Sequence, residues 1–295
     1  MNSDDSIGDK TRPRFGNRFL TNENDVFKHN AWDQVDWTEE QLAEVDEKIK
    51  CNSAHRVDDD SKSKYLLKAD EYWDKFYQTH QDKFFKDRHW LFTEFPELLS
   101  NDVNVIFEIG CGVGNTIFPL LALRENPETM IYCCDFSPVA IDLLKSNNSF
   151  DESRCKPFVC DVTQDQLSLP FEESSLDVIV SIFTLSAIPP KSIPETIKKL
   201  SRYLKPGGLF LFRDYGKYDL AQVRFKKGSC MDDNFYVRGD GTMAYFFTPE
   251  EVGKLFVDSG LEKVSLITDK RLQVNRGKQL KMYRVWIQAK YRKPD

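Results

Sequence analysis

The sequence has 295 residues, of which 40% are hydrophobic and 30% are charged, so it can bury one large core. No apolar run reaches the roughly 18 residues of a transmembrane helix, and the acidic, polar start does not resemble a signal or transit peptide. We therefore expect no membrane segment and a cytoplasmic location. The net charge of −6 argues against a nucleic-acid partner, but residues 205–295 carry 18 basic and 11 acidic side chains. This last segment is either a polyanion-binding surface or an ordinary solvated face.

The cysteines and histidines indicate neither a disulfide framework nor a metal centre. There are seven cysteines, an odd number without a C-x-x-C pair, and several lie in apolar strand-like runs. The four histidines lack metal-ligand spacing. We expect buried free thiols and no metal.

The first part of the chain predicts an arm followed by helices. Residues 12–20 combine basic and aromatic side chains. Thr38 and Gln41 form a capping box that starts a helix. The polar residues 52–63 predict a linker, and the apolar spacing over 65–76 predicts one continuous helix.

From residue 103 onward, apolar strands alternate with helices. Strands are predicted at 105–109, 130–134, 157–160, 176–183 and 209–212. This alternation is typical of an α/β fold with a mostly parallel sheet and helices on both faces. Two further strands near 264–267 and 282–289 make the sheet seven-stranded. Aromatic and basic residues over 215–247 predict an insertion that contains a hairpin.

A glycine loop follows the first of these strands. Gly110, Gly112 and Gly114 remove side chains where a backbone must approach a ligand, and a helix follows them. Asn115 stands where the dinucleotide pattern G-x-G-x-x-G has its last glycine, which disfavours a dehydrogenase. A purely structural turn would explain the glycines alone.

Two acids strengthen the case for a nucleoside. Asp135 ends the second strand and can accept hydrogen bonds from ribose hydroxyls. Asp161 follows the third strand and is placed to reach an adenine amino group. The glycines and both acids, in this order, predict a nucleoside cofactor.

The motif E-x-G-C-G-x-G-N over 108–115, the acid at 135 and L-K-P-G-G over 204–208 resemble the class I methyltransferases. The resemblance implies a Rossmann-like fold with an N-terminal helical extension, and S-adenosyl-L-methionine as cofactor. The cofactor-binding residues it implies are Trp73, Tyr77, Gly110, Gly112, Gly114, Asp135, Phe136, Asp161, Val162 and Ile182. In this set Gly110 and Gly112 lie beside the methionine moiety, and Trp73 and Tyr77 fold over the cofactor. Spacing alone favours an ordinary amphipathic core face for Trp73 and Tyr77.

Longer segments resemble the tRNA N3-methylcytidine methyltransferases. They are Y-W-D-K-F-Y over 72–77, F-F-K-D-R-H-W-L-F over 84–92, C-D-F-S-P over 134–138 and F-R-D-Y-G over 212–216. R-P-R-F-G-N-R-F-L over 12–20 and H-N-A-W-D over 29–33 narrow the resemblance to the methyltransferase-like protein 2 branch. It implies methylation of cytidine 32 in the anticodon loop of threonine and some arginine tRNAs, with an accessory protein for some tRNAs.

This resemblance suggests three parts of the chain. Residues 1–64 are a partly flexible, RNA-contacting arm and helix, and 65–102 are a helical cofactor lid and substrate segment. Residues 103–295 are the methyltransferase domain.

The chemistry needs no general base, because the N3 atom of neutral cytidine carries a lone pair and no proton. The candidate catalytic residues are Asp214, Arg88 and Tyr215. Asp214 would accept the cytosine amino hydrogens, and its alternative role is a salt bridge to Arg213 or to another basic residue. The candidate substrate-binding residues are Phe84, Phe85 and Trp90 for stacking, and Lys86, His89, Arg224, Lys226 and Lys227 for RNA contacts. The basic residues could instead serve solubility alone.

Other functions stay open from the sequence. The core motifs fit a methyltransferase for a protein or a small molecule equally well, and a non-catalytic cofactor-binding partner is a third reading. We expect a monomer, since no heptad seam is apparent.

Overall fold

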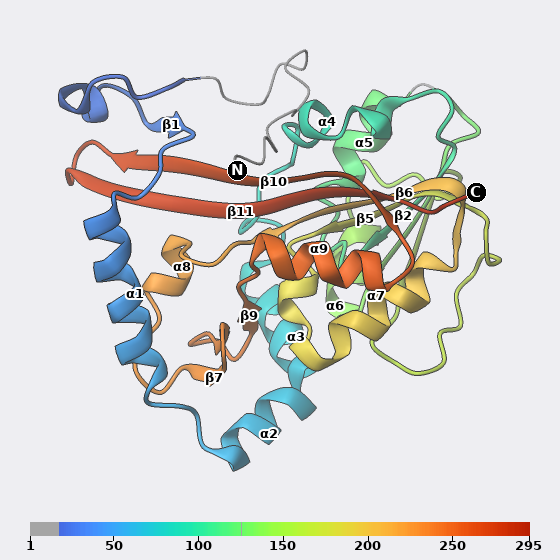
Figure 1. Ribbon diagram of the computed structural model, residues 1–295. Coiled ribbons are helices and arrows are strands. Elements are labelled where there is room, and N and C mark those ends of the chain that lie inside the picture. The colour runs from blue at the N-terminus through green and yellow to red at the C-terminus, as the bar shows by residue number, and fades with distance from the viewer. Residues whose placement is uncertain (1–17, 125) are drawn as a thin grey trace.

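The computed structural model describes residues 18–124 and 126–295 (Figure 1). Its centre is an eight-stranded sheet in the order β1-β10-β11-β6-β5-β2-β3-β4. The strands are β1 (Ala31–Asp33), β2 (Val105–Ile109), β3 (Met130–Asp135), β4 (Cys155–Val159), β5 (Leu176–Ile182), β6 (Leu204–Tyr215), β10 (Glu262–Asn275) and β11 (Leu280–Arg292). β2 to β6 pair in parallel, while β11, β10 and β1 add antiparallel. The predicted α/β sheet is confirmed, and the short β1 adds an eighth strand at its edge.

Helices cover both faces of this sheet. The covering helices are α4 (Leu91–Glu94), α5 (Ile117–Leu123), α6 (Pro138–Lys145), α7 (Ile193–Ser201) and α9 (Pro249–Asp258). Successive residues of β5 alternate between two cores: Ile179 packs with α7 and α9, whereas Val178 and Val180 pack with α4, α5 and α6. This alternation fixes the register of the strand, because a slip of one residue would exchange the two faces.

The N-terminal part of the chain is more helical than the sequence predicts. It contains α1 (Glu39–Ser53), α2 (Asp59–Leu67) and α3 (Ala69–His80), with 3₁₀ turns at Glu23–Lys28 and Pro96–Leu99. The capping box at Thr38 is confirmed. The predicted linker over 52–63 is wrong in its second half, because the side chain of Asp58 accepts the Ser61 N–H at 2.8 Å and caps α2. The helix predicted over 65–76 is confirmed apart from a break at Lys68, where the backbone leaves helical geometry.

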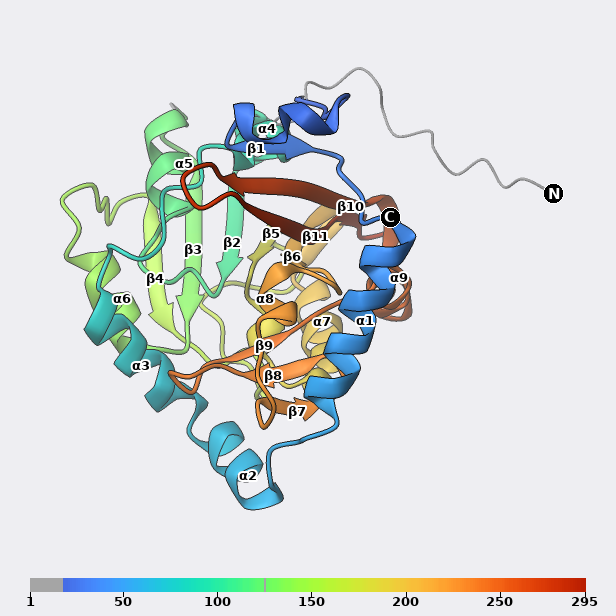
Figure 2. The same cartoon turned by 90° about the vertical axis from the view of Figure 1, so that its left-hand side faces the viewer.

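The insertion over 215–247 forms its own small sheet below the main one (Figure 2). It contains α8 (Leu220–Val223), β7 (Cys230–Asp232), β8 (Phe235–Val237) and β9 (Met243–Tyr245). The three strands are antiparallel, so the predicted hairpin is confirmed. Further 3₁₀ turns lie at Leu185–Ala187 and Pro190–Ser192, directly after β5.

Three remaining sequence predictions concern the ends, the thiols and the membrane. Residues 12–17 of the basic-aromatic stretch lie outside the described residues. The final two strands are confirmed but are much longer than predicted, and they form a ribbon that projects from the sheet (Figure 1). All seven cysteines are free thiols. In the described part of the chain, no helix is long and apolar enough to cross a membrane.

Candidate active site

The glycine loop turns sharply between β2 and α5. Gly110, Gly112 and Gly114 have φ angles of +62°, +53° and +92°, which side chains disfavour. A Cβ atom on Gly110 would lie 2.3 Å from Cγ2 of Thr184, and one on Gly112 would lie 2.8 Å from the hydroxyl oxygen of Tyr77. Gly110 and Gly112 therefore let the chain pass close to neighbours that border a cavity.

Gly114 has a different role from its two neighbours. A Cβ atom there would lie 2.5 Å from the ring of Phe118. Gly114 lines neither of the two cavities described below. The structure thus places Gly114 against the ring of Phe118, just before α5, where it makes room for packing.

Asp135 at the end of β3 stabilises the glycine loop through hydrogen bonds. Its Oδ2 accepts the N–H of Gly112 at 2.9 Å and its Oδ1 accepts the N–H of Ser137 at 3.0 Å. Burial raises the pKa of this carboxyl to about 6, and these two N–H groups oppose the shift. Because each oxygen has a second lone pair, the carboxylate can still accept hydrogen bonds from hydroxyl groups of a ligand.

A first cavity lies over the carboxyl ends of the parallel strands, where open α/β sheets bind ligands. It is lined by seven predicted cofactor residues: Trp73, Tyr77, Gly110, Asp135, Phe136, Asp161 and Val162. One oxygen of Asp161 accepts both the N–H and the hydroxyl of Thr163, at 2.9 and 2.7 Å. Its other oxygen has no hydrogen bond within residues 18–124 and 126–295, so it is available to a ligand amino group.

Helix α3, which precedes the parallel strands in the sequence, forms one wall of this cavity. Asp74 accepts a hydrogen bond from the hydroxyl of Ser137 at 2.5 Å, which ties α3 to the start of α6 (Figure 2). Tyr77 is buried, whereas Trp73 is half-buried and borders the cavity. The indole N–H of Trp73 is buried and finds no acceptor in the described part of the chain. An orphaned donor at a cavity wall favours a ligand that supplies the acceptor.

A second cavity adjoins the first and shares walls with it. Trp73, Tyr77, Gly110, Phe183 and Ala187 line both. Its further walls are Phe76, Phe84, Phe85, Arg88, Cys111, Gly112, Asn115, Ile182, Ser186, Tyr215, Arg238, Asp240, Thr242 and Met243. Two ligands bound in these cavities would meet beside Gly110 and Phe183.

The structure brings several predicted catalytic and substrate residues to this second cavity. Phe84, Phe85, Arg88 and Tyr215 line it, and so do Gly112 and Ile182, which the sequence predicts as cofactor residues. Arg88 is fixed by a hydrogen bond of 3.0 Å from its Nη1 to the hydroxyl of Thr116.

Asp214 lies beneath the cavity wall and does not line it. It is fully buried, and its two oxygens accept the N–H groups of Ser186 at 2.9 Å and of Tyr215 at 2.8 Å. Burial raises its pKa to about 6, and the charge of Arg238 is one of the interactions that lower it. Arg213 pairs with Asp269 instead, so the alternative salt bridge between Asp214 and Arg213 is not formed.

Other predicted substrate residues lie away from both cavities. Lys86 and His89 are exposed on the segment after α3, and Arg224, Lys226 and Lys227 are exposed between α8 and β7. The ring of Trp90 packs under the guanidinium of Arg213, with 4.9 Å between the Arg213 Cζ atom and the ring centroid. Arg213 therefore covers one face of this ring, and Trp90 lines neither cavity.

Several wall residues were missed by the sequence analysis. Phe183 has a φ of +58°, unusual for an aromatic residue, and its N–H donates to the carbonyl of Arg213 at 2.8 Å. Nothing in the sequence signals this turn.

Glu108 lies behind the glycine loop; burial raises its pKa to about 7, and its Oε2 is unpartnered among the described residues. The motif E-x-G-C-G contained it, but no role was assigned.

No cluster of metal-ligating side chains occurs within residues 18–124 and 126–295. Cys111 lines the second cavity, but burial raises the pKa of its thiol to about 12. At neutral pH this thiol is protonated and is a poor nucleophile.

Comparison with known proteins identifies the domain. A family model described as a methyltransferase domain matches residues 107–210. The solved PH0226 protein of Pyrococcus horikoshii is 18% identical and superimposes with a TM-score of 0.54, covering 75% of this chain and 99% of that one. A putative methyltransferase solved with the Haloferax volcanii Trm112 activator gives a TM-score of 0.54 at 16% identity, covering 78% and 98%. These two structures support the fold.

Curated relatives match nearly the whole chain. The tRNA N(3)-methylcytidine methyltransferase Mettl2 of Drosophila melanogaster is 54% identical over 95% of this chain and 88% of its own length. The human tRNA N(3)-cytidine methyltransferase METTL2B is 45% identical, covering 98% and 95%. The tRNA(Thr) (cytosine(32)-N(3))-methyltransferase of Saccharomyces cerevisiae is 45% identical over 95% of this chain and 46% of that protein. With cavities for two ligands that meet at a glycine loop, the chain belongs to the tRNA N(3)-cytidine methyltransferase family.

Proposed function

We propose that this protein transfers the methyl group of S-adenosylmethionine to N3 of cytidine 32 in the anticodon loop of threonine tRNA. The observation that carries the proposal is the meeting of the two cavities beside Gly110 and Phe183 in a member of this family. Action on arginine tRNAs and the need for an accessory protein stay predictions, as does the monomeric state.

The first cavity fits the cofactor. The loop at Gly110, where the first cavity adjoins the part of the second cavity that Gly112 lines, would receive the methionine end, and the oxygens of Asp135 and Asp161 would hold the ribose and the adenine amino group. The orphaned indole N–H of Trp73 offers one more donor at the cavity wall. Bound S-adenosylmethionine supplies a methyl group that is activated by the sulfonium charge.

The second cavity would receive the cytosine. Its N3 atom is on the Watson–Crick edge, so the base must be unpaired and turned out of the loop. Phe84 and Tyr215 offer aromatic surface, and Phe84 is 54% exposed at the rim. Lys86, Arg224, Lys226 and Lys227 lie outside the cavity, where the RNA backbone would pass.

The chain's own task in the reaction is positioning. The N3 lone pair forms the new bond as the carbon–sulfur bond breaks, and the electrons of that bond remain on sulfur. No proton is removed, and the residues that line the second cavity include no histidine. The positive charge that develops on the base is offset by the carboxylate of Asp214 beneath the wall.

The proposal is tested with threonine tRNAs that carry cytidine or uridine at position 32 and are otherwise identical. The N3 atom of uridine is protonated, so we expect methyl transfer from labelled S-adenosylmethionine to the cytidine tRNA alone. Equal labelling of both tRNAs would refute the target position. Labelling of a protein or a small molecule, and not of the tRNA, would favour a methyltransferase that acts on such a substrate.

A further inference from the structure

One arginine of the small sheet offers unused hydrogen-bond donors to the second cavity. Arg238 follows β8, and its Nη1 donates to the hydroxyl of Thr242 at 3.3 Å and to the carbonyl of Met243 at 2.9 Å. These two bonds fix the orientation of the planar guanidinium. Its Nε and Nη2 atoms have no hydrogen-bond partner among the described residues, and the side chain borders the cavity.

Arg238 lies beside the aromatic wall of the cavity and near a buried carboxylate. Its Cζ atom is 5.8 Å from the centroid of the Tyr215 ring. Asp214, the residue before Tyr215, is fully buried and close enough for the arginine charge to act on its ionisation. The positive charge of Arg238 is therefore partly offset by the negative charge of this carboxylate.

We propose that Arg238 binds the O2 carbonyl of the target cytosine and so orients N3 towards the methyl group. The inference rests on the proposed function. A guanidinium has donors only, and the cytosine edge has two acceptors, O2 and N3. Because N3 must keep its lone pair for the methyl carbon, O2 is the acceptor left for Arg238. Asp214 then prevents the arginine charge from opposing the cation that forms on the base.

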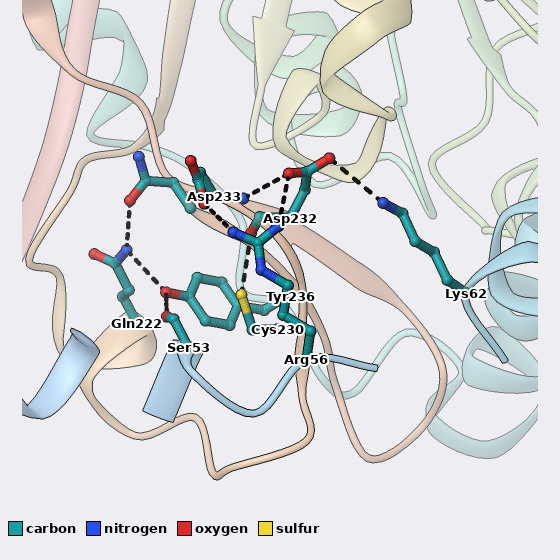
Figure 3. Close-up of polar contacts among 9 residues, drawn as sticks. Ser53, Arg56, Lys62, Gln222, Cys230, Asp232, Asp233 and Tyr236 are labelled. Carbon is teal, nitrogen blue, oxygen red and sulfur yellow. Dashed lines mark hydrogen bonds and ion pairs between the residues drawn. The ribbon is translucent and has the colours of Figure 1, made fainter. Parts of the chain in front are cut away.

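The N-terminal segment holds the small sheet in place, as Figure 3 shows. Arg56 donates to Asp232 at 3.2 Å and to Asp233 at 2.5 Å, and Lys62 lies 3.4 Å from the other oxygen of Asp232. The hydroxyl of Ser53 bonds that of Tyr236 at 3.0 Å (Figure 3). Each exposed ion pair is weak alone.

Backbone contacts add to this attachment. The N–H of Val57 donates to the carbonyl of Cys230 at 2.8 Å, and the N–H of Gly228 donates to the carbonyl of His55 at 2.8 Å. The connection between α1 and α2 is therefore attached along β7, next to the β8–β9 hairpin that carries Arg238.

The tip of the hairpin also rests on the helix that closes the cofactor cavity. Gly241 has a φ of +88°, and a Cβ atom there would lie 2.1 Å from the ring of Tyr72 on α3. Arg238 is thus supported on both sides, by the α1–α2 connection and by α3. Such support reduces the entropy that the arginine would lose on binding a base.

The test combines variants with an atomic change in the RNA. Threonine tRNA is prepared with cytidine or 2-thiocytidine at position 32, which replaces O2 by a weaker acceptor. The kcat/KM for methylation is measured for the wild type, Arg238→Ala and Arg238→Lys. Arg224→Ala is the matched control, because it removes an exposed arginine of the same insertion outside the cavity. S-adenosylmethionine affinity, measured by calorimetry, reports folding of the first cavity, which Arg238 does not line.

For the wild type we expect a roughly tenfold lower kcat/KM with the sulfur-substituted RNA. Arg238→Ala should lower kcat/KM on the normal RNA by about 10- to 100-fold, as for loss of a charged hydrogen bond. It should also abolish the difference between the two RNAs. Arg224→Ala should affect both RNAs equally. If Arg238→Ala does not bind the cofactor, Arg238→Lys replaces it in the comparison. For Arg238→Lys the difference in kcat/KM between the two RNAs should also be smaller than for the wild type.

The inference is overturned if the Arg238 variants keep the full wild-type dependence on O2, or if Arg238→Ala methylates the normal RNA at the wild-type rate. Equal losses on both RNAs with a weaker salt dependence would place Arg238 on a phosphate and also overturn it. A wild type that forms no N3-methylcytidine would instead refute the proposed function.

Discussion

Replacing Gly112 by alanine should test whether the close packing of the glycine loop is needed for cofactor binding. The loss of cofactor affinity has to be distinguished from a loss of stability caused by backbone strain alone. Gly112 has a φ of +53°, and the added Cβ would lie 2.8 Å from the hydroxyl oxygen of Tyr77. The left-handed backbone alone costs alanine about 1–2 kcal/mol. The displaced Tyr77 should in addition lower affinity for S-adenosylmethionine at least tenfold, which corresponds to about 1.4 kcal/mol.

Gly228→Ala is the matched control for this variant. Gly228 has a φ of +79°, but no atom lies within 4 Å of the position of a Cβ. Its substitution should lower the free energy of unfolding by a similar strain of about 1–2 kcal/mol and leave cofactor affinity unchanged. Unfolding by denaturant and binding by calorimetry measure the two quantities separately.

A second substitution should relieve the clash. Tyr77→Phe removes the hydroxyl oxygen, after which the nearest ring atom is 3.5 Å from the new Cβ. In the double variant Gly112→Ala/Tyr77→Phe, affinity should therefore recover relative to Gly112→Ala, as a double-mutant cycle would show. Wild-type affinity for Gly112→Ala, or an equal loss for Gly228→Ala, would refute the reasoning.

Three further predictions follow from charge. Burial raises the pKa of Glu108 to about 7 and of Asp135 to about 6, so the folded state binds more protons than the unfolded state over that range. The free energy of unfolding without cofactor should thus fall as pH rises from about 5 to 7.5, and denaturant titrations should show a smaller fall for Glu108→Gln; an equal fall would contradict this. Asp214→Asn should lower kcat about tenfold or more at saturating cofactor, since the charge beneath the second cavity is lost, and full turnover with normal cofactor affinity would exclude that role. Lys227→Ala should weaken tRNA binding and reduce the slope of log affinity against log salt by about 1, whereas an unchanged slope would mean that Lys227 serves solubility.

The elements with strong local signals could be predicted from the sequence. The glycine loop, Asp135 and the cap at Thr38 depend on neighbouring residues, and the structure has these features at those positions. The acidic run at 58–60 was misread as a linker. The same residues favour a helix start, where a carboxylate accepts free N–H groups and complements the helix dipole.

The second cavity depends on contacts between distant segments. Arg238 borders it only because the insertion folds back beside α3, whereas Trp90 does not line it and packs against the distant Arg213. Asp214 lies near the end of β6, and strand periodicity does not reveal that its oxygens accept the N–H groups of Ser186 and Tyr215. Such pairings arise from tertiary packing, which local patterns do not encode.

The central claim is tested most directly by identifying the methylated nucleoside. The purified protein is incubated with labelled S-adenosylmethionine and threonine tRNA, both transcribed and native, and the RNA is then digested to nucleosides. We predict label in N3-methylcytidine from position 32, and label in the native tRNA alone would add a requirement for an earlier modification. Label in another nucleoside, or none in any RNA despite demonstrated cofactor binding, would contradict the account.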